Sequence, residues 1–298
     1  MEPIIDAHHH IWRQADQPWL QGPTVPRIFG AYDALKRDYP VEEFLSDIAG
    51  SGVVKSVYVQ TNWGKGQEIK EVEWVQANAD RAGWPHAIVS YVDFQSEQAP
   101  QVMAAQAKSP LMRGVRQQLH WHANEQYRFA PAPDQMNTAA FRKNFALLEE
   151  RGWLFELQVF TSQMADGSAL AKAFPGITIV LEHAGMPEDR SAEGRRAWRE
   201  GMRRLADQPN MHTKFSGLGT FIRRNDAQHI ADIVGETLEL FGANRCVWGS
   251  NFPIEKLWTD YASIVNAIRS ALTSVPEGNR RAVLHDTAAR LYRLDETK

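Results

Sequence analysis

The sequence predicts an α/β fold, a (β/α)8 TIM barrel, in a single domain over residues 1–298. Eight short apolar or β-branched segments alternate with segments of helical apolar spacing, which favours a closed parallel barrel over an open sheet. No linker, low-complexity segment or change of composition divides the chain. A length of 298 residues is one that α/β barrels commonly occupy as a single domain.

The first half of the chain contains four of the expected strands, at residues 4–6, 53–60, 86–92 and 112–119. Three helices are expected between them, at residues 41–51, 69–82 and 98–107. In the first of these, Phe44, Leu45 and Ile48 share one helical face, and Gly50 and Gly52 follow as stop signals. The polar, proline-bearing stretch 13–40 is too long for a plain connection, so we expect it to form a lid or rim over a site.

The second half repeats the alternation with four more strands, at residues 154–160, 177–181, 211–215 and 245–248. Helical spacing predicts helices at residues 138–150, 168–174, 192–206, 228–241, 261–272 and 280–292. Gly152 and the pair Pro175–Gly176 mark the ends of two of them. The arginine-rich helix at 192–206 is expected to present a solvated face.

Composition excludes several classes of function. A formal net charge of -3, without basic blocks, argues against a nucleic-acid or anionic-membrane surface. No apolar run approaches the ~20 residues of a membrane helix, and the N-terminus lacks the pattern of a signal peptide. The single cysteine, Cys246, rules out an internal disulfide and fits a reducing compartment, so we expect a cytoplasmic protein.

Histidines gather at the end of the first strand, in Asp6-Ala7-His8-His9-His10. Successive side chains of a strand point to opposite faces, so His8 and His10 are expected to share one face and His9 to occupy the other. Two imidazoles on one face can bind one metal ion or one anionic oxygen together.

Later strands also end in polar residues. His120 and His122 follow the fourth strand, His183 the sixth and Asn251 the eighth. Because active sites of such barrels lie at the C-terminal ends of the strands, we expect these side chains to surround one pocket. His8, His10 and His183 would give a neutral set of three imidazoles, without a carboxylate, that suits one Zn²⁺ and leaves a position open.

Three strand ends carry a resemblance to a known family. They are Asp6-Ala7-His8-His9-His10-Ile11-Trp12, Leu181-Glu182-His183-Ala184-Gly185 and Trp248-Gly249-Ser250-Asn251-Phe252-Pro253. In this order they resemble strand ends of the amidohydrolase superfamily, and most closely its lactonase-containing amidohydrolase 2 branch of TIM-barrel hydrolases. The similarity extends from Ile4 to the closing Ala288-Ala289-Arg290-Leu291-Tyr292.

The resemblance implies hydrolysis of a ring lactone or related cyclic ester, often one made from a sugar acid. It assigns His8, His10 and His183 to a metal ion or to the substrate. Some members of the branch work without a metal, so the resemblance implies one of two arrangements. Either the histidines bind one divalent ion, with zinc as the first candidate, or they polarise the carbonyl by hydrogen bonding. Residues 155–159 offer no lysine or histidine where binuclear relatives place a bridging ligand, which disfavours two metal ions.

The chain departs from the family at the eighth strand. The residue there is commonly an aspartate that deprotonates the attacking water, but this chain has Asn251, and an amide cannot accept that proton. Asn251 can still orient the water. The candidates for the missing base are Glu255, four residues later, and a metal-free His183, although Glu255 also suits a helix cap or a surface ion pair.

Residues for substrate binding are also expected at the strand ends. Arg116, in the fourth strand, suits a carboxylate or a hydroxyl-rich acid through its planar donor fork, and equally suits a rim salt bridge. Aromatic residues that could stack on a sugar-like ring, or simply pack, are Trp12, Trp63, Trp121 and Phe252. His120 and His122 are open between substrate contact and loop structure.

Three functions compete. A hydrolase that opens a lactone of a sugar acid ranks first. A metal-dependent decarboxylase of an aromatic or unsaturated acid, which needs no attacking water, and a non-catalytic sugar-acid binding protein are the alternatives. Each has a small-molecule ligand, and fold alone does not choose among them. The sequence leaves open whether the chain forms a homo-oligomer.

Overall fold

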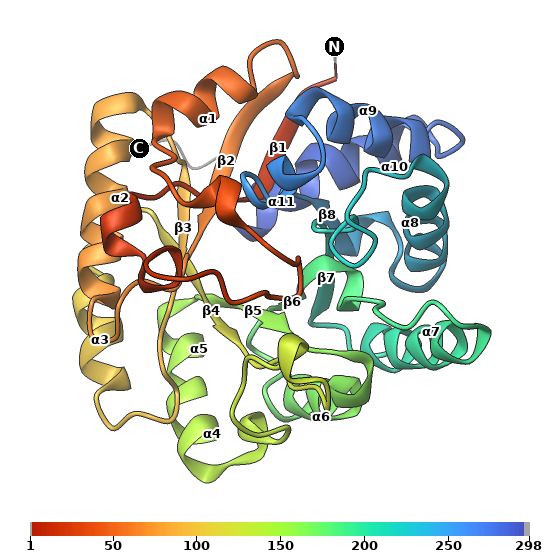
Figure 1. The fold of residues 1–298 in the computed structure, drawn as a ribbon. Coiled ribbons are helices and arrows are strands. Elements are labelled where there is room, and N and C mark those ends of the chain that lie inside the picture. The colour runs from red at the N-terminus through yellow and green to blue at the C-terminus, as the bar shows by residue number, and fades with distance from the viewer. Residues whose placement is uncertain (1, 295–298) are drawn as a thin grey trace.

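The chain folds into eight parallel strands arranged in sequence order around a nearly closed barrel, in a computed structural model that describes residues 2–294 (Figure 1). The strands are β1 (Ile4–His9), β2 (Val53–Val59), β3 (Ala87–Ser90), β4 (Met112–Gln118), β5 (Leu154–Gln158), β6 (Ile179–Leu181), β7 (Met211–Phe215) and β8 (Cys246–Trp248). The predicted (β/α)8 barrel is therefore confirmed. All eight predicted strands are present, within a few residues of the expected ends.

The segment that follows β8 brings the last strand against the first. The Asn251 amide donates to the carbonyl of His8 (2.7 Å), and the His10 amide donates to the carbonyl of Phe252 (2.7 Å). The buried Asp6 carboxylate accepts the Ser250 amide (2.8 Å) through one of its oxygens. This closure places the residues after β8 directly beside the histidines of β1.

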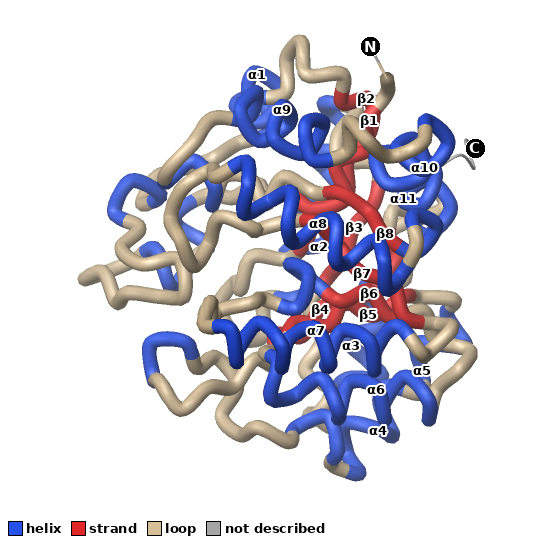
Figure 2. Tube along the Cα trace, turned by 90° about the vertical axis from the view of Figure 1, so that its right-hand side faces the viewer, coloured by secondary structure: helices blue, strands red, loops and turns tan. Residues whose placement is uncertain are grey.

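Helices surround the strands, as Figure 2 shows from the side. They are α1 (Val41–Asp47), α2 (Glu68–Ala82), α3 (Ala99–Gln106), α4 (Ala139–Phe145), α5 (Leu147–Arg151), α6 (Met164–Ala173), α7 (Ala192–Ala206), α8 (Ala227–Phe241), α9 (Tyr261–Ala271), α10 (Glu277–Arg281) and α11 (Thr287–Leu291). Between residues 2 and 294, no helix combines the length and apolar character that crossing a membrane requires.

Several predicted helices have different bounds. The helix expected at 41–51 ends at Asp47, and the one expected at 280–292 begins at Glu277 and contains a π-helical turn over Ala282–Asp286 between α10 and α11. The predicted helix 138–150 is divided at Ala146 into α4 and α5. Helix α6 begins at Met164 rather than at residue 168, so Gly167 lies inside the helix and not before it. A Cβ on Gly167 would lie 3.0 Å from Leu157 of β5, so the glycine allows close packing of α6 on the barrel.

The core has two layers that follow the alternation of the strands. One set of strand side chains packs outward against the helices, and it includes Ile4, Tyr58, Ile88 and Phe155. The other set fills the barrel interior, with Ile5, Val57, Val89, Val180 and Val247, and is completed by Ala288 and Tyr292 near the C-terminus. The interior also contains charged residues of β4, β5 and β7: Arg116 pairs in register with Glu156, and Lys214 with Val247.

The predicted lid over residues 13–40 is confirmed. Side chains from this stretch, among them Trp19, Arg27 and Phe29, line a cavity at the barrel mouth. Hydrogen bonds attach the lid to the segment after β2: Trp19 Nε1 donates to the Thr61 carbonyl (2.8 Å) and Gln17 Nε2 donates to Thr61 Oγ1 (2.7 Å). The lid is thus fixed to the barrel and forms one wall of the site.

Candidate active site

A cavity opens at the carboxyl ends of the strands, beneath the lid. Its lining residues are His10, Trp12, Trp19, Arg27, Ile28, Phe29, Gln60, Thr61, Asn62, Arg116, Gln118, Gln158, His183, Thr220, Asn251 and Ile254. Most of the polar ones are uncharged amides and hydroxyls. The site therefore lies where the active sites of such barrels lie.

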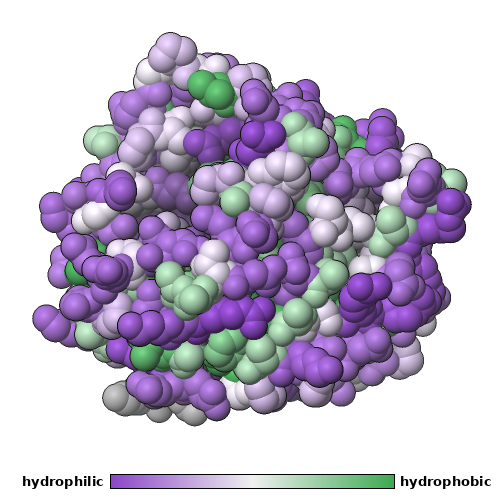
Figure 3. All heavy atoms as spheres, turned by 90° about the horizontal axis from the view of Figure 1, so that it is seen from below, coloured by the Kyte–Doolittle hydropathy of each residue, from purple (hydrophilic) through white to green (hydrophobic). Residues whose placement is uncertain are grey.

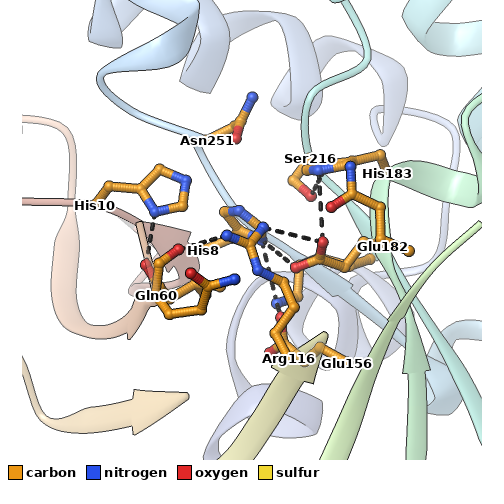
Figure 4. A network of polar contacts seen from close by, with 12 residues as sticks. His8, His10, Gln60, Arg116, Glu156, Glu182, His183, Ser216 and Asn251 are labelled. Carbon is orange, nitrogen blue, oxygen red and sulfur yellow. Dashed lines mark hydrogen bonds and ion pairs between the residues drawn. The ribbon is translucent and has the colours of Figure 1, made fainter. Parts of the chain in front are cut away.

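The three predicted histidines converge here (Figure 4). The ring centroid of His8 lies 5.0 Å from that of His10 and 5.0 Å from that of His183. His10 and His183 line the cavity, and His8 lies buried beside them. His9 points to the opposite face, as predicted, and stacks on Phe44 of α1 with ring centroids 3.8 Å apart.

His183 is positioned by an unusual backbone. From His183 to Met186 four successive residues have positive φ, at 55°, 49°, 71° and 50°. Left-handed conformations cost non-glycine residues about 1 to 3 kcal/mol each and concentrate at functional sites. Trp198 of α7 supports the turn by donating from Nε1 to the Ala184 carbonyl (2.8 Å). The turn presents both Glu182 and His183 at the end of β6.

Glu182 links the histidines to Arg116. Its Oε1 lies 3.2 Å from His8 Nδ1, and its Oε2 accepts from Arg116 Nη1 (3.2 Å) and lies 3.7 Å from His183 Nε2. The Arg116 guanidinium also donates to the Gln60 carbonyl. Arg116 is therefore at the cavity floor in a buried ion pair, not in the rim salt bridge that the sequence left open.

Burial keeps the three histidines neutral. It lowers the pKa of His183 to about 3, with further lowering by the nearby charges of Arg116 and Lys214. It also lowers the pKa of His8 and of His10 well below the ordinary histidine value, again with help from neighbouring cations. At neutral pH each imidazole therefore has one nitrogen that can accept a proton or bind a cation.

The residues fit a divalent metal ion, and the group whose ligand atoms lie closest together includes a carboxylate. His8, Glu182 and His183 have ligand atoms within 4.8 Å of one another. His8 Nε2 and Glu182 Oε1 are buried and have no hydrogen-bond partner among the described residues. Glu182, which shares the inward face of Val180, therefore adds a carboxylate to the candidate ligands, whereas the sequence pointed to His8, His10 and His183 alone.

A hydrogen bond to the backbone fixes the tautomer of His10. Its Nδ1 lies 2.7 Å from the Val59 carbonyl oxygen, which can only accept, so Nδ1 must carry the hydrogen. Nε2 is then the unprotonated nitrogen. Fixing the tautomer through a carbonyl in this way is common for metal-binding and catalytic histidines.

Asn251 and Glu255 form a pair in which only Asn251 lines the cavity. Asn251 Nδ2 donates to Glu255 Oε1 (3.4 Å), and Trp258 Nε1 donates to Glu255 Oε2 (2.8 Å). The Asn251 carbonyl oxygen is left for the pocket. Burial raises the pKa of Glu255 to about 7, against the lowering effect of its two donors.

Of the other residues predicted to bind substrate, some lie at the cavity or beside it and the rest lie elsewhere. Trp12 lines the cavity, but its Nε1 donates to the Arg37 carbonyl (2.8 Å) inside the lid. His120 lines an adjoining hollow that shares Arg27 and Gln118 with the cavity. Four others lie outside the cavity lining. Trp63 faces a separate hollow over α2 and α3, and the Trp121 ring lies 5.1 Å from the guanidinium carbon of Arg128. His122 lies near Glu188 (4.0 Å), and Phe252 packs on Tyr261 with ring centroids 4.9 Å apart.

Several residues of the site were not predicted from the sequence. Glu182 directly precedes His183 in the strand end Leu181–Gly185, and this adjacency could have indicated that it belongs to the site. Lys214 is the fourth of the five residues of β7, and a charged residue at an inward position of a strand points to a function. No sequence pattern indicates Arg27 or Gln60, because only the folding of the lid and of the segment after β2 brings them to the cavity.

The geometry agrees with the sequence relationships of the chain. The amidohydrolase family model matches residues 5–294. The chain belongs to the amidohydrolase family. An uncharacterized protein, y4mH, of Sinorhizobium fredii is 34% identical to this amidohydrolase over 98% of both chains. An L-fucono-1,5-lactonase of Burkholderia ambifaria is 29% identical over 98% of this chain and 96% of its own.

A solved structure supports the same relationship. A zinc-bound amidohydrolase of Burkholderia multivorans superimposes with a TM-score of 0.82, is 26% identical and covers 98% of this chain and 99% of its own. The predicted hydrolase class is confirmed for this amidohydrolase. Members of the family act on small molecules, and the His8–Glu182–His183 group is suited to a divalent cation.

Proposed function

We propose that this amidohydrolase opens the ring of a lactone of a sugar acid or a related carboxylic compound. The convergence of His10, Arg116, His183 and Asn251 on one cavity carries the proposal. Its uncharged polar lining (Gln60, Thr61, Asn62, Gln118, Gln158 and Thr220) suits a polyhydroxylated ring, and the Trp12, Trp19 and Phe29 rings suit its C–H faces. The 29% identical lactonase relative favours this substrate class over decarboxylation.

In the proposed reaction, water adds to the lactone carbonyl carbon and the bond from that carbon to the ring oxygen breaks. The ring oxygen takes a proton, so the product is a hydroxy acid. Asn251 orients the water through its carbonyl oxygen, because its amide nitrogen is bound to Glu255. In the metal-free protein, neutral His183 accepts the proton of the water and returns it to the ring oxygen, and its pKa of about 3 makes it a weak base.

His10 and Arg116 have binding roles. Arg116 donates toward the oxygen that becomes negative in the tetrahedral intermediate, where a fixed donor stabilises the transition state. Glu182 and the Gln60 carbonyl hold its guanidinium in place. His10, whose Nε2 is unprotonated, accepts a substrate hydroxyl. Glu255 acts through Asn251 and is a positioning residue.

We propose zinc as the divalent ion for His8, Glu182 and His183, since zinc prefers imidazole and carboxylate ligands. Bound there, zinc would polarise the carbonyl and lower the pKa of a water molecule. A metal-bound His183 could not also accept the proton. Metal content and activity therefore have to be measured on the same preparation.

A panel of aldonolactones tests the proposal. The purified protein, with its metal content determined, should release acid from at least one 1,4- or 1,5-lactone in a weakly buffered pH-indicator assay. The variant Asn251→Leu should lose this activity while circular dichroism stays unchanged. Release of CO₂ from aromatic acids without lactone turnover would favour the decarboxylase, and ligand binding without any turnover would favour the binding protein.

A further inference from the structure

The lining of the cavity has an unbalanced charge. Among the described residues that line it, two are arginines, Arg27 and Arg116, and none is an aspartate or glutamate. Arg116 is neutralised from beneath by Glu182, whose Oε2 accepts from its Nη1 at 3.2 Å. Arg27 has no such partner: within residues 2–294 its guanidinium makes no ion pair or hydrogen bond.

The lid holds Arg27 over the cavity by other contacts. Its guanidinium carbon lies 5.2 Å from the ring centroid of Trp19 and 6.0 Å from that of Tyr32. Tyr32 in turn donates from its hydroxyl to the Trp19 carbonyl (3.0 Å), so the two rings form one platform. Contacts of this kind place the cation and leave its N–H groups free.

The backbone around Arg27 is also tied down. Arg27 and Gly30 exchange both amide-to-carbonyl hydrogen bonds, at 3.1 and 2.8 Å. Gln126, on the loop after β4, donates to the Arg27 carbonyl (3.2 Å). The guanidinium of Arg223 covers Gly30 so closely that a Cβ there would lie 2.7 Å from it. Arg27 is therefore presented from a tight turn that two barrel loops support.

We propose that Arg27 is a specificity-determining residue and that the substrate carries a carboxylate outside the ring that is opened. This inference rests on the proposed lactone hydrolysis and narrows its substrate class. A single free guanidinium has one charge and a two-pronged donor fork, which match a carboxylate monoanion better than a phosphate dianion. A neutral sugar lactone would leave this charge unpaired.

Matched lactones test the proposal directly. Glucono-1,4-lactone and glucaro-1,4-lactone differ only in a CH₂OH or a carboxylate at the end of the chain, and the galacto pair repeats the comparison. The wild-type protein should hydrolyse the carboxylate-bearing member of at least one pair with the higher kcat/KM. Arg27→Gln should lower that kcat/KM by about 10- to 100-fold, the range for a lost hydrogen bond to a charged group.

Two further variants separate recognition from structure. Arg27→Lys keeps the charge but not the fork and should retain part of the preference. Arg13→Gln is the matched control, because Arg13 is on the same lid but outside the cavity lining, and its Nε donates to Asp16 (2.5 Å). It should leave both lactones unaffected, and Arg27→Gln should lower kcat/KM for the neutral lactone less than for the carboxylate-bearing one.

Equal losses on both lactones in Arg27→Gln, or no preference of the wild type for the carboxylate, would overturn the Arg27 proposal alone. If no lactone is hydrolysed, the proposed function fails instead. Calorimetric binding of each lactone pair to wild type and Arg27→Gln then decides the Arg27 role. Tighter binding of the carboxylate-bearing lactone that Arg27→Gln abolishes supports the proposal, and equal binding or none overturns it.

Discussion

Lys214 Nζ lies 2.7 Å from Glu156 Oε2 inside the barrel, where both side chains are fully buried. Tyr292 donates from its hydroxyl to the other oxygen of Glu156 (2.7 Å), and Lys214 Nζ lies 3.4 Å from His8 Nδ1. Aliphatic side chains usually fill this part of an α/β barrel. The ion pair therefore connects the floor of the active site to the C-terminal residues that complete the interior.

Removing one partner of this pair should destabilise the fold strongly. Lys214→Met or Glu156→Gln each leaves a buried group without its partner, so we expect a loss of about 3 to 5 kcal/mol in the free energy of unfolding. Urea denaturation monitored by tryptophan fluorescence measures it. The exposed pair Arg203–Glu200 (3.0 Å) gives the control: Arg203→Met should cost at most about 1 kcal/mol. Similar losses in the buried and exposed variants would contradict the prediction.

His183→Asn and Glu255→Gln should separate a proton acceptor from a positioning residue. Loss of a general base typically costs about 10² to 10⁴ in rate, so His183→Asn should lose at least a hundredfold in kcat on an identified lactone. Glu255→Gln can still accept from Asn251, so it should lose about tenfold or less. If Glu255→Gln is the more severe variant and shifts the pH profile, Glu255 supplies the base.

The buried Glu255 should make stability fall as pH rises. Its pKa of about 7 in the folded chain lies above the ordinary value of 4.5, so the folded protein holds this proton more tightly than the unfolded one. The stabilisation is complete below about pH 4.5 and is lost as pH rises through about 7. Between these limits, wild type should lose on the order of 3 kcal/mol relative to Glu255→Gln. Parallel stability curves of the two proteins would contradict this.

At most one divalent ion should bind per chain. His8→Asn and Glu182→Gln should each lower the zinc retained after dialysis against excess metal by at least tenfold, because each removes one of three protein ligands. His122→Asn, a histidine outside the cavity lining, is the control and should retain wild-type zinc. Elemental analysis measures the content. Two ions per chain would show that the ligand set is larger than His8, Glu182 and His183.

The sequence alone determined the barrel and much of its mouth. Alternating strands and helices are local patterns, so the eight strands and the lid over residues 13–40 could be predicted without knowing any contact. The twofold period of a strand is equally local. It placed His8 and His10 on one face and His9 on the other, and the rule that strand ends meet brought His183 and Asn251 to the same pocket.

Only the tertiary structure decided which groups surround those residues. Glu182 lies two residues after the interior Val180, so strand alternation turns it toward His8. His183 joins the same side only because the chain turns through left-handed conformations after β6, and no periodic pattern announces such a turn. Glu255 lies behind Asn251 and Arg27 lies over the cavity because of contacts between segments far apart in the sequence. Burial and neighbouring charges then set the protonation of His183, and both arise only when the barrel closes.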